Sequence, residues 1–426
     1  MSTCTRFNCF QSFTAFFLFL SLISCQKKSG IEGKSAVAVD QVSVINRLDG
    51  SQIDSAELSQ RIAFLMGEAE VTGLAIAVFN EGKVAYQRAF GYANFEEKER
   101  LRVDHGFYAA SFSKAVFGYV VARLVDEGQL DLDQPLQDYL DYPLYEIKTD
   151  REWRGFQDLK GDDRYQRITL RMCLSHRTGF QNWRWIPSPM DPENYGEKGQ
   201  LKIYFEPGTS YFYSGEGLYL AQRVIEEVTG QGLEELAQSY VFQPLNMNYT
   251  SYLWHERFDD RFCLGHTADQ KTVDKDFPDQ VISAGSMETT LIDYSRFMAH
   301  VLQSYTDSSA AVKEMFRPNF AIRTEAQFGL GALRSSDEND DIALNYGLGW
   351  GLLQTPYGFG AFKEGHDAGF QHYSILFPES QMGVLILTNS DNGESIFKAL
   401  LEHSIADRYT PWKWQNYIPY DQPSNQ

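Results

Sequence analysis

The 426-residue chain is strongly acidic, with 57 Asp and Glu against 38 Lys and Arg and a formal net charge of −19. Phosphate binding needs stripes of Lys and Arg, so this balance argues against nucleic acid as a partner. Hydrophobic residues make up 43% of the chain, which is enough for the core of one large domain or of two intertwined ones.

The N-terminus has the features of a secretory signal. Arg6 precedes the apolar run 13–23, which is too short to span about 30 Å of hydrocarbon as a helix but is typical of a signal-peptide core. The letters LISC at 22–25 resemble a bacterial lipobox, in which the cysteine becomes the lipidated first residue. We expect a signal peptide over 1–24 and a lipid on Cys25, which would anchor the protein in the bacterial cell envelope, on the periplasmic side or the cell surface. An ordinary signal peptide that contains Cys25 is the alternative.

A tether, a hairpin and a helix are predicted next. Residues 25–54 are largely polar and lack helical periodicity, which is typical of a tether. Two β-rich runs within 72–94 flank the Asn-Glu-Gly of 80–82, a hairpin signal. Apolar residues at helical spacing then predict a helix over 112–127.

The middle of the chain alternates helical and irregular segments. Residues 168–180 predict a short helix and a turn. Pro and Gly punctuate 181–204, so this segment, which contains Trp183 and Trp185, is expected to be an irregular loop that can form a pocket wall. A second helix is predicted over 217–229.

The last elements complete an α+β fold. Two strand runs, 372–378 and 382–389, are followed by a helix over about 395–408 and a tail over 409–426. Because strands lie at both ends of the domain at 55–408 and helices lie between them, we expect the N- and C-terminal strands to meet in one antiparallel sheet flanked by helices.

The cysteines and histidines predict neither a metal site nor a cofactor. Beyond the signal region only Cys173 and Cys263 remain, and the sequence leaves open whether they pair. The sequence contains no C-x-x-C pair and no H-E-x-x-H helix, so a metal site has no local support.

A Ser-x-x-Lys pattern occurs three times, at Ser24–Lys27, Ser111–Lys114 and Ser395–Lys398, so the spacing alone predicts nothing. Ser24–Lys27 would be lost or split on processing. At the first turn of the predicted helix, Lys114 lies on the same face as Ser111 and can act as its base if burial lowers the lysine pKa. Free N–H groups at the helix start would stabilise an acyl-transfer transition state. A helix-capping serine beside a solvated lysine is the alternative.

Two later segments add candidate residues. Tyr213 stands just before the helix at 217–229 and can relay a proton if a nearby lysine lowers its pKa. Lys363, Glu364 and Gly365 stand where a strand is expected to begin, and a glycine there lets a substrate approach the backbone closely. The alternatives are that Tyr213 is an ordinary structural tyrosine and that Lys363 is a charged residue at the edge of a strand.

Taken in order, these segments resemble the serine β-lactamase and penicillin-binding-protein superfamily, most closely its class C-like branch of esterases, D-amino-acid peptidases and related lipoproteins. The matching segments are Ser111-Phe-Ser-Lys114, Tyr213-Ser-Gly215, Lys363-Glu-Gly365, LSHRTGF at 174–180, FQPLNMNYTSY at 242–252 and YGLGWG at 346–351. The resemblance covers about 55–405 and implies the β-lactamase/transpeptidase-like fold with an inserted, mostly helical subdomain. The resemblance excludes Ser395–Lys398, because no tyrosine or lysine motif of the family follows it in the chain.

The resemblance implies a role for each residue. Ser111 is the acylated nucleophile, Lys114 its base or proton shuttle, and Tyr213 the second proton-transfer residue. Lys363 binds a substrate carboxylate or tunes Tyr213. The backbone N–H groups of Ser111 and of His366, just past Gly365, form the oxyanion hole.

Two positions depart from the family pattern. Asparagine, which contacts a substrate amide, is usual where this chain has Gly215, and Glu216 is the candidate substitute. Threonine or serine is usual where it has Glu364, whose charge would neutralise Lys363 and weaken the binding of an anionic substrate. Gly215→Asn should therefore improve acylation by amides or β-lactams, because it restores the missing amide contact.

The sequence therefore predicts a lipid-anchored serine hydrolase that acts through a Ser111 acyl-enzyme on an ester or peptide substrate of D-amino-acid or cell-wall type. Its expected partners are a small-molecule or peptide acyl substrate and, through the lipid, the membrane. A catalytically impaired relative that binds cell-wall peptide or a partner, and a β-lactamase, are the alternatives. Trp183, Trp185 and Trp350 would suit an apolar acyl or aromatic group, and a place in the core is the alternative for each of them.

Overall fold

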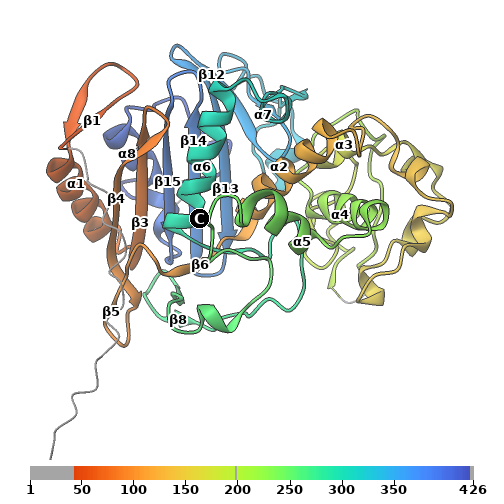
Figure 1. Ribbon diagram of the computed structural model, residues 1–426, viewed down its shortest axis with the longest axis horizontal. Helices are drawn as coiled ribbons and strands as arrows, with labels where there is room; N and C mark the ends of the chain where they lie inside the picture. The colour runs from red at the N-terminus through yellow and green to blue at the C-terminus, as the bar shows by residue number, and fades with distance from the viewer. Residues whose placement is uncertain (1–42, 197–198, 423–426) are drawn as a thin grey trace, which may run out of the picture. The chain divides into compact units, whose positions relative to one another are not determined.

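The computed structural model describes residues 43–196 and 199–422 (Figure 1). The predicted signal peptide over 1–24 and the lipid site Cys25 lie outside these residues. Within them, no helix is long and apolar enough to cross a bilayer.

The last part of the predicted tether belongs to the folded domain. Strands β1 (Val44–Asn46) and β2 (Gln52–Asp54) pair antiparallel, and Ile45 and Ile53 point into the core. The tether predicted over 25–54 was therefore too long by the residues from 43 onward. Each strand is only three residues long, which is too short for a readable alternation of apolar and polar side chains.

Nine antiparallel strands form the main sheet, in the order β10-β11-β12-β13-β14-β15-β3-β4-β5. They are β3 (Gly73–Asn80), β4 (Lys83–Asn94), β5 (Glu99–Arg100), β10 (Phe320–Ala321), β11 (Asn345–Tyr346), β12 (Gly351–Thr355), β13 (Gly358–Asp367), β14 (Phe370–Phe377) and β15 (Met382–Thr388). β15 lies beside β3, with Ile386 opposite Ile76, so the two ends of the domain meet in one sheet. The predicted α+β fold is confirmed.

The predicted hairpin is also present. β3 and β4 are joined by Glu81 and Gly82, both of which have positive φ, as the two-residue turns that match strand twist require. Every residue of β3 is buried, because helices cover both faces of the sheet here, and this explains its continuous apolar run.

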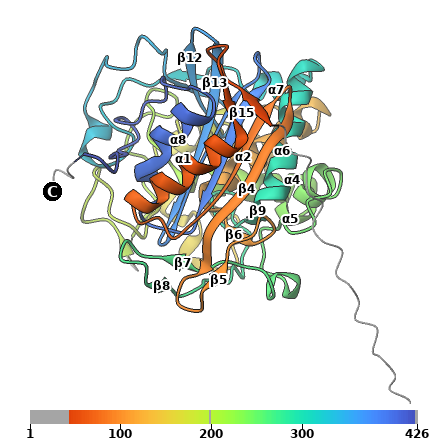
Figure 2. The same ribbon diagram turned by 90° about the vertical axis from the view of Figure 1, so that its left-hand side faces the viewer.

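Two hydrophobic clusters lie on opposite faces of the sheet. Helices α1 (Ser55–Glu68) and α8 (Phe397–Ser404) pack beside each other on one face (Figure 2). Helices α2 (Ser113–Asp126) and α6 (Leu291–Thr306) contribute to the other cluster (Figure 1).

The connection between β5 and β10 contains most of the helices, as the resemblance implied. These are α2, α3 (Leu170–Leu174), α4 (Gly215–Thr229), α5 (Leu233–Ala237), α6 and α7 (Ala310–Met315), with short 3₁₀ turns over 136–167. Two small pairs of strands, β6 (Gly106–Tyr108) with β9 (Glu288–Thr290) and β7 (Gly265–His266) with β8 (Thr272–Val273), complete this region. The predicted helices over 112–127 and 217–229 match α2 and α4 within two residues at either end.

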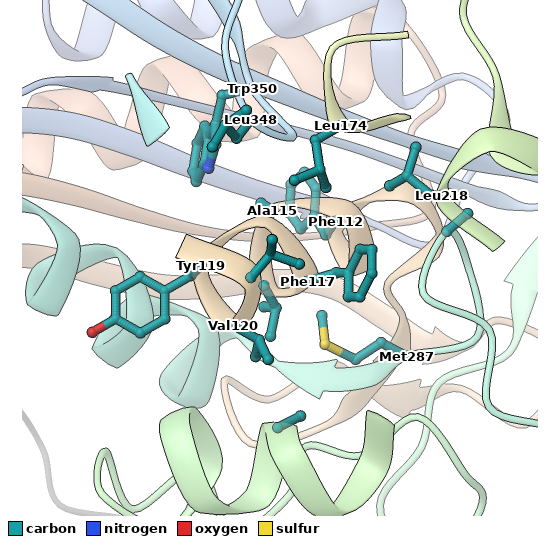
Figure 3. Packing of buried hydrophobic residues seen from close by; sticks show 14 of the residues in the cluster. Phe112, Ala115, Phe117, Tyr119, Val120, Leu174, Leu218, Met287, Leu348 and Trp350 are labelled. Carbon is teal, nitrogen blue, oxygen red and sulfur yellow. The ribbon is translucent and has the colours of Figure 1, made fainter. Parts of the chain in front are cut away.

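The core around α2 holds the start of that helix rigidly. Phe112, Phe117 and Val120 pack among Leu174, Leu218 and Met287, and Leu348 and Trp350 close the far side (Figure 3). Trp350 is fully buried here, so it belongs to the core rather than to a pocket. Cys173 and Cys263 are buried free thiols.

The predicted C-terminal tail over 409–426 is likewise part of the fold as far as residue 422. Trp412, Trp414 and Tyr417 are buried in the cluster that contains α1 and α8, and Trp414 donates to Thr324 Oγ1 at 3.0 Å. These aromatic residues contact strands from elsewhere in the chain, so no local periodicity identifies the segment as ordered.

Candidate active site

Ser111 stands in a 3₁₀ turn, Ala110–Phe112, that leads directly into α2. Ala110 has a φ of +47°, an unusual backbone conformation for a residue with a side chain. Ser113 holds this turn: its Oγ donates to Ala110 O at 2.6 Å and accepts from Met287 N at 3.2 Å. The turn is thus fixed in a strained conformation, of a kind that tends to occur at functional sites.

Lys114 lies beside Ser111, as the spacing predicted. Its Nζ is 2.8 Å from Ser111 Oγ and donates to Ala284 O at 2.5 Å. The side chain is only 1% exposed, and this burial holds its pKa well below the usual value of 10.5, with a further lowering by the charge of Lys363. A buried lysine with a lowered pKa can act as a base toward the hydroxyl it touches.

Tyr213 and Lys363 complete the group. Lys363 Nζ donates to Tyr213 OH at 3.1 Å, and the Nζ atoms of Lys114 and Lys363 each lie 5.1 Å from the centre of the Tyr213 ring. Burial raises the pKa of Tyr213, and the charge of Lys363 and hydrogen bonds from Ser111 and Lys363 offset only part of the increase. Lys363 thus acts on the tyrosine pKa in the direction considered for a proton relay, but burial outweighs it and the net pKa is raised.

Glu364 sits against Lys363 and changes its character. Glu364 Oε1 is 3.2 Å from Lys363 Nζ and accepts from Gln327 Nε2 at 2.6 Å. Burial alone would lower the pKa of Lys363, but Glu364 and Tyr213 outweigh it, so the pKa is raised. The pKa of Glu364 is lowered despite its burial, because of Lys363. Lys363 is therefore charged but neutralised, which favours the tuning of Tyr213 over the capture of a carboxylate.

Gly365 brings strand β13 close to the turn that carries Ser111. A Cβ at position 365 would lie 2.9 Å from Ala109 O, so any side chain would push the two segments apart. Lys363 to His366 lie near the end of β13, which begins five residues before Lys363, at Gly358, rather than at the lysine as predicted. The His366 side chain turns toward Glu394, with 2.6 Å between Nε2 and Oε2, so only its backbone is available to an oxyanion hole.

Gly215 proves not to be an empty position. A Cβ there would lie 2.4 Å from Trp183 Cζ2, because the indole covers the start of α4 where a side chain would project. Glu216 is not a substitute for the missing asparagine either. Its carboxylate accepts two hydrogen bonds at 2.9 Å from the Arg184 guanidinium, and both residues are buried.

The structure reverses the expected effect of Gly215→Asn. We expect this variant to lose about 1–3 kcal/mol of stability through overpacking against Trp183, with no gain in amide or β-lactam acylation. The double variant Gly215→Asn/Trp183→Ala has room for the asparagine and should recover stability. Thermal unfolding and the acylation rate of all three proteins check this. A stable single variant with faster acylation would contradict the packing argument.

A cavity of about 700 Å³ opens over Ser111. One part of its wall comes from the irregular loop, with Trp183, Trp185 and Ile186, as predicted for 181–204. Residues that the sequence did not single out also line it: Tyr108, Arg151, Arg154, Asn182, Asp276, Phe328, Asp367, Glu394, Gln415, Asn416 and Tyr417. No cluster of His, Cys, Asp and Glu able to hold a metal ion is found in the described part of the chain.

His176 supports Tyr213 and was not among the predicted site residues. Its ring packs 4.2 Å from the Tyr213 ring, and its Nδ1 accepts from Ser214 N at 3.1 Å. Burial, together with the charges of Lys114 and Lys363, holds the pKa of His176 well below 6.5, so the ring is neutral. His176 lies within the motif LSHRTGF, which the family resemblance had already singled out. That its ring packs against Tyr213 depends on the fold.

The third Ser-x-x-Lys pair forms no site. Lys398 is exposed and donates to Glu402 Oε1 at 2.7 Å, while Ser395 Oγ donates to Asn392 O. The same spacing thus has two outcomes, because only Lys114 is buried against its serine.

Several known proteins are similar to this chain in sequence. The sequence model of the Beta-lactamase family matches residues 58–406. Penicillin-binding protein 4* of Bacillus subtilis is 24% identical over 370 residues, which are 79% of this chain and 72% of that protein. Esterase EstB of Burkholderia gladioli is 27% identical over 46% of this chain and 52% of its own length. The lovastatin esterase of Penicillium rubens is 31% identical over 40% of this chain and 46% of its own length.

A solved structure shares the fold. The octameric penicillin-binding protein homologue from Pyrococcus abyssi superposes with a TM-score of 0.63 and 20% sequence identity, over 85% of this chain and 80% of that chain. At this identity the likeness concerns the arrangement of the sheet and its helices.

Proposed function

Because the chain belongs to the Beta-lactamase family, we propose that it is a serine hydrolase that forms an acyl-enzyme on Ser111. The observation that carries the proposal is the contact between Ser111 Oγ and the buried amine of Lys114, 2.8 Å apart. A serine hydroxyl is a weak nucleophile until a neighbouring base accepts its proton, and a lysine whose pKa is lowered is such a base.

The proposed reaction begins with transfer of the Ser111 proton to Lys114 Nζ as Oγ bonds to the carbonyl carbon of the substrate. The negative charge that develops on the carbonyl oxygen is stabilised by the backbone N–H groups of Ser111 and His366. Tyr213 then gives its proton to the leaving oxygen as the carbon–oxygen bond breaks, and the charged Lys363 stabilises the resulting tyrosinate. The proton that Lys114 took from Ser111 then passes to the tyrosinate, which restores Lys114 and Tyr213 to their starting states. Water releases the acyl group by the same steps in reverse.

We propose esters rather than peptides as substrates. Position 215 has no side chain to hold a substrate amide, and Trp183 covers the place where one would project. Lys363 is neutralised by Glu364, so the site offers no unpaired ammonium beside Ser111 for a substrate carboxylate. Similarity to two esterases is consistent with this choice. Hydrolysis of peptides or β-lactams, and binding of cell-wall peptide without turnover, are the alternatives that the experiment below and a substrate screen separate.

The proposal also places the enzyme in the cell envelope. It rests on the apolar run 13–23 and the lipobox-like LISC at 22–25, which would leave Cys25 as a lipidated first residue. Intact mass of the membrane-extracted protein tests it, since a diacylated Cys25 and loss of 1–24 give a defined mass.

A fluorophosphonate probe tests the central step. We expect intact-protein mass spectrometry of the signal-free protein to show a single adduct, which peptide mapping places on Ser111, because its hydroxyl contacts a buried lysine amine whose pKa is lowered. Ser395→Ala is the matched control, since it removes the serine of the same sequence pattern, and it should label normally. No adduct on a folded protein would favour the non-catalytic binding protein.

A further inference from the structure

We propose that Trp183 and Trp185 form an aromatic subsite that binds a flat, apolar ring on the acyl group of the substrate. The inference rests on the proposed function and names the class of ester that it takes. Both tryptophans are half-buried and line the cavity over Ser111, so part of each indole is available to a ligand.

Trp183 holds its place because position 215 is glycine. Its six-membered ring occupies the space in which any side chain at 215 would begin, 2.4 Å from an ideal Cβ. The indole therefore covers the start of α4, two residues beyond Tyr213. Trp185 stacks on Trp183 with 4.5 Å between ring centres and 20° between planes. Because Trp183 has Gly215 on one face and Trp185 on the other, the two stacked rings form a single aromatic wall that meets a ligand mainly with ring edges.

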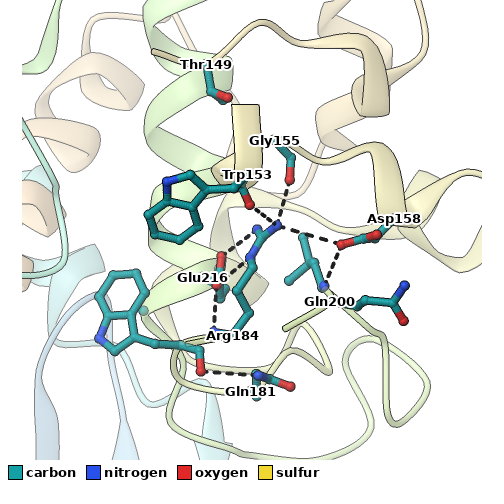
Figure 4. A network of polar contacts seen from close by, with 12 residues as sticks. Thr149, Trp153, Gly155, Asp158, Gln181, Arg184, Gln200 and Glu216 are labelled. Carbon is teal, nitrogen blue, oxygen red and sulfur yellow. Dashed lines mark hydrogen bonds and ion pairs between the residues drawn. The ribbon is translucent and has the colours of Figure 1, made fainter. Parts of the chain in front are cut away.

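The residue between them fixes this wall to the fold. Arg184 projects away from the cavity and is 2% exposed, while its partner Glu216, in α4, is 1% exposed. The guanidinium and the Arg184 backbone N–H together make three bonds of 2.9 Å to the Glu216 carboxylate. The guanidinium also donates to Gly155 O at 2.7 Å (Figure 4). Asp158 lies 3.9 Å from the same guanidinium, and loss of Arg184 would leave the buried Glu216 carboxylate without its charge partner, so the pair resists displacement.

A second arginine, Arg154, packs against Trp185 and also lines the cavity. The Arg154 guanidinium carbon lies 4.6 Å from the centre of the Trp185 ring and 5.1 Å from that of Trp153, which meets Trp185 edge-on at 5.4 Å. Such cation–π contacts restrain both the arginine and the rings. The neighbouring Arg151 is bound by Asp279, at 3.1 and 3.2 Å, so its charge is compensated. The subsite is therefore rigid before the substrate binds, so its side chains lose little conformational entropy when a ring binds.

Three p-nitrophenyl esters that differ only in the acyl group test the subsite: the acetate, the phenylacetate and the cyclohexylacetate. Each kcat/KM is divided by the rate constant for alkaline hydrolysis of the same ester. We expect the wild-type protein to prefer phenylacetate over acetate by about tenfold, and over the puckered cyclohexyl ester by a few fold, because the face of a flat aromatic ring is attracted to the edges of the two indoles.

Trp183→Ala should lower kcat/KM for the phenylacetate about tenfold, mainly through KM, and leave the acetate within about twofold. Trp183→Phe should keep most of the preference. Trp254→Ala, a tryptophan outside the cavity lining, should change neither ester, and labelling by fluorophosphonate reports that each variant is folded. If the wild type hydrolyses the three esters alike, or Trp183→Ala slows all of them equally, the subsite is overturned while the hydrolase stands. If the wild type hydrolyses no ester and takes no label, the proposed function fails with it.

Discussion

Ser111→Ala is expected to lower kcat/KM for p-nitrophenyl esters by about 10⁴-fold or more, while the protein stays folded. The hydroxyl is the only atom lost, and Lys114 keeps its hydrogen bond to Ala284 O. The turn itself is held by Ser113, which is untouched. Ester hydrolysis measures the first effect and thermal unfolding the second.

Ser395→Ala is the control for this prediction, because it removes the serine of the other Ser-x-x-Lys pair in the described chain and should leave turnover unchanged. Retained hydrolysis in the Ser111 variant, on protein free of host esterases, would mean that another group is acylated or that a water attacks directly. Loss of both activity and folding would instead identify Ser111 as a structural residue of the turn.

Lys114→Met is expected to lower kcat/KM by about 10³-fold or more, because it removes the amine that contacts Ser111 Oγ, and Tyr213, which also hydrogen-bonds to Ser111, has a raised pKa and is a poor base. Lys114→Arg keeps a positive charge but should be inactive at every pH tested, since a guanidinium does not give up its proton in proteins. In the wild type, protonated Lys114 cannot accept the serine proton. Activity should therefore rise with pH through the lowered pKa of Lys114, well below 10.5. A flat or descending profile over that range would contradict the role of Lys114 as base.

The same shift has a consequence for stability. A lysine whose pKa is lowered in the folded state binds a proton more readily when the chain unfolds, so it destabilises the protein increasingly as pH falls from 10.5 toward the folded pKa. Lys114→Met removes this term. The free energy of unfolding of the variant, minus that of the wild type, should therefore grow as pH falls over this range. Denaturant unfolding at several pH values checks the sign, with Lys398→Met, an exposed lysine, as the control.

The surroundings of the two lysines near Tyr213 shift their pKa values in opposite directions. No carboxylate of the described residues forms an ion pair with Lys114, so burial and the nearby charge of Lys363 lower its pKa and the more distant Glu364 offsets only part of this. Lys363 is equally buried but has Glu364 at 3.2 Å, which keeps it charged. Two like groups with pKa values pushed apart are a common way to provide a base and a charge-stabilising group in one site. In this chain Glu364, a departure from the family pattern, is what separates them.

Much of the fold follows from local sequence patterns. The apolar run of β3, the Asn-Glu-Gly turn after it and the helical spacing in α2 and α4 each describe an element whose stabilising residues are neighbours in the chain. The family resemblance could also be read from the sequence, because it rests on the order of three short motifs, which begin at Ser111, Tyr213 and Lys363. The segments 43–54 and 409–422 were missed because their strands are short or their aromatic residues pack against distant strands.

The properties of the site likewise fall into those that the sequence predicts and those that depend on tertiary packing. Sequence by itself brought Ser111 and Lys114 together, because one helical turn fixes a spacing of three residues. It also placed Tyr213 and Lys363 in the site through the family resemblance. Only the tertiary structure decided that Lys114 is buried, that the pKa of Tyr213 is raised and that Trp183 fills the space at Gly215. Those properties depend on burial and on side chains tens to hundreds of residues apart, and burial is set by how the elements pack rather than by any local pattern.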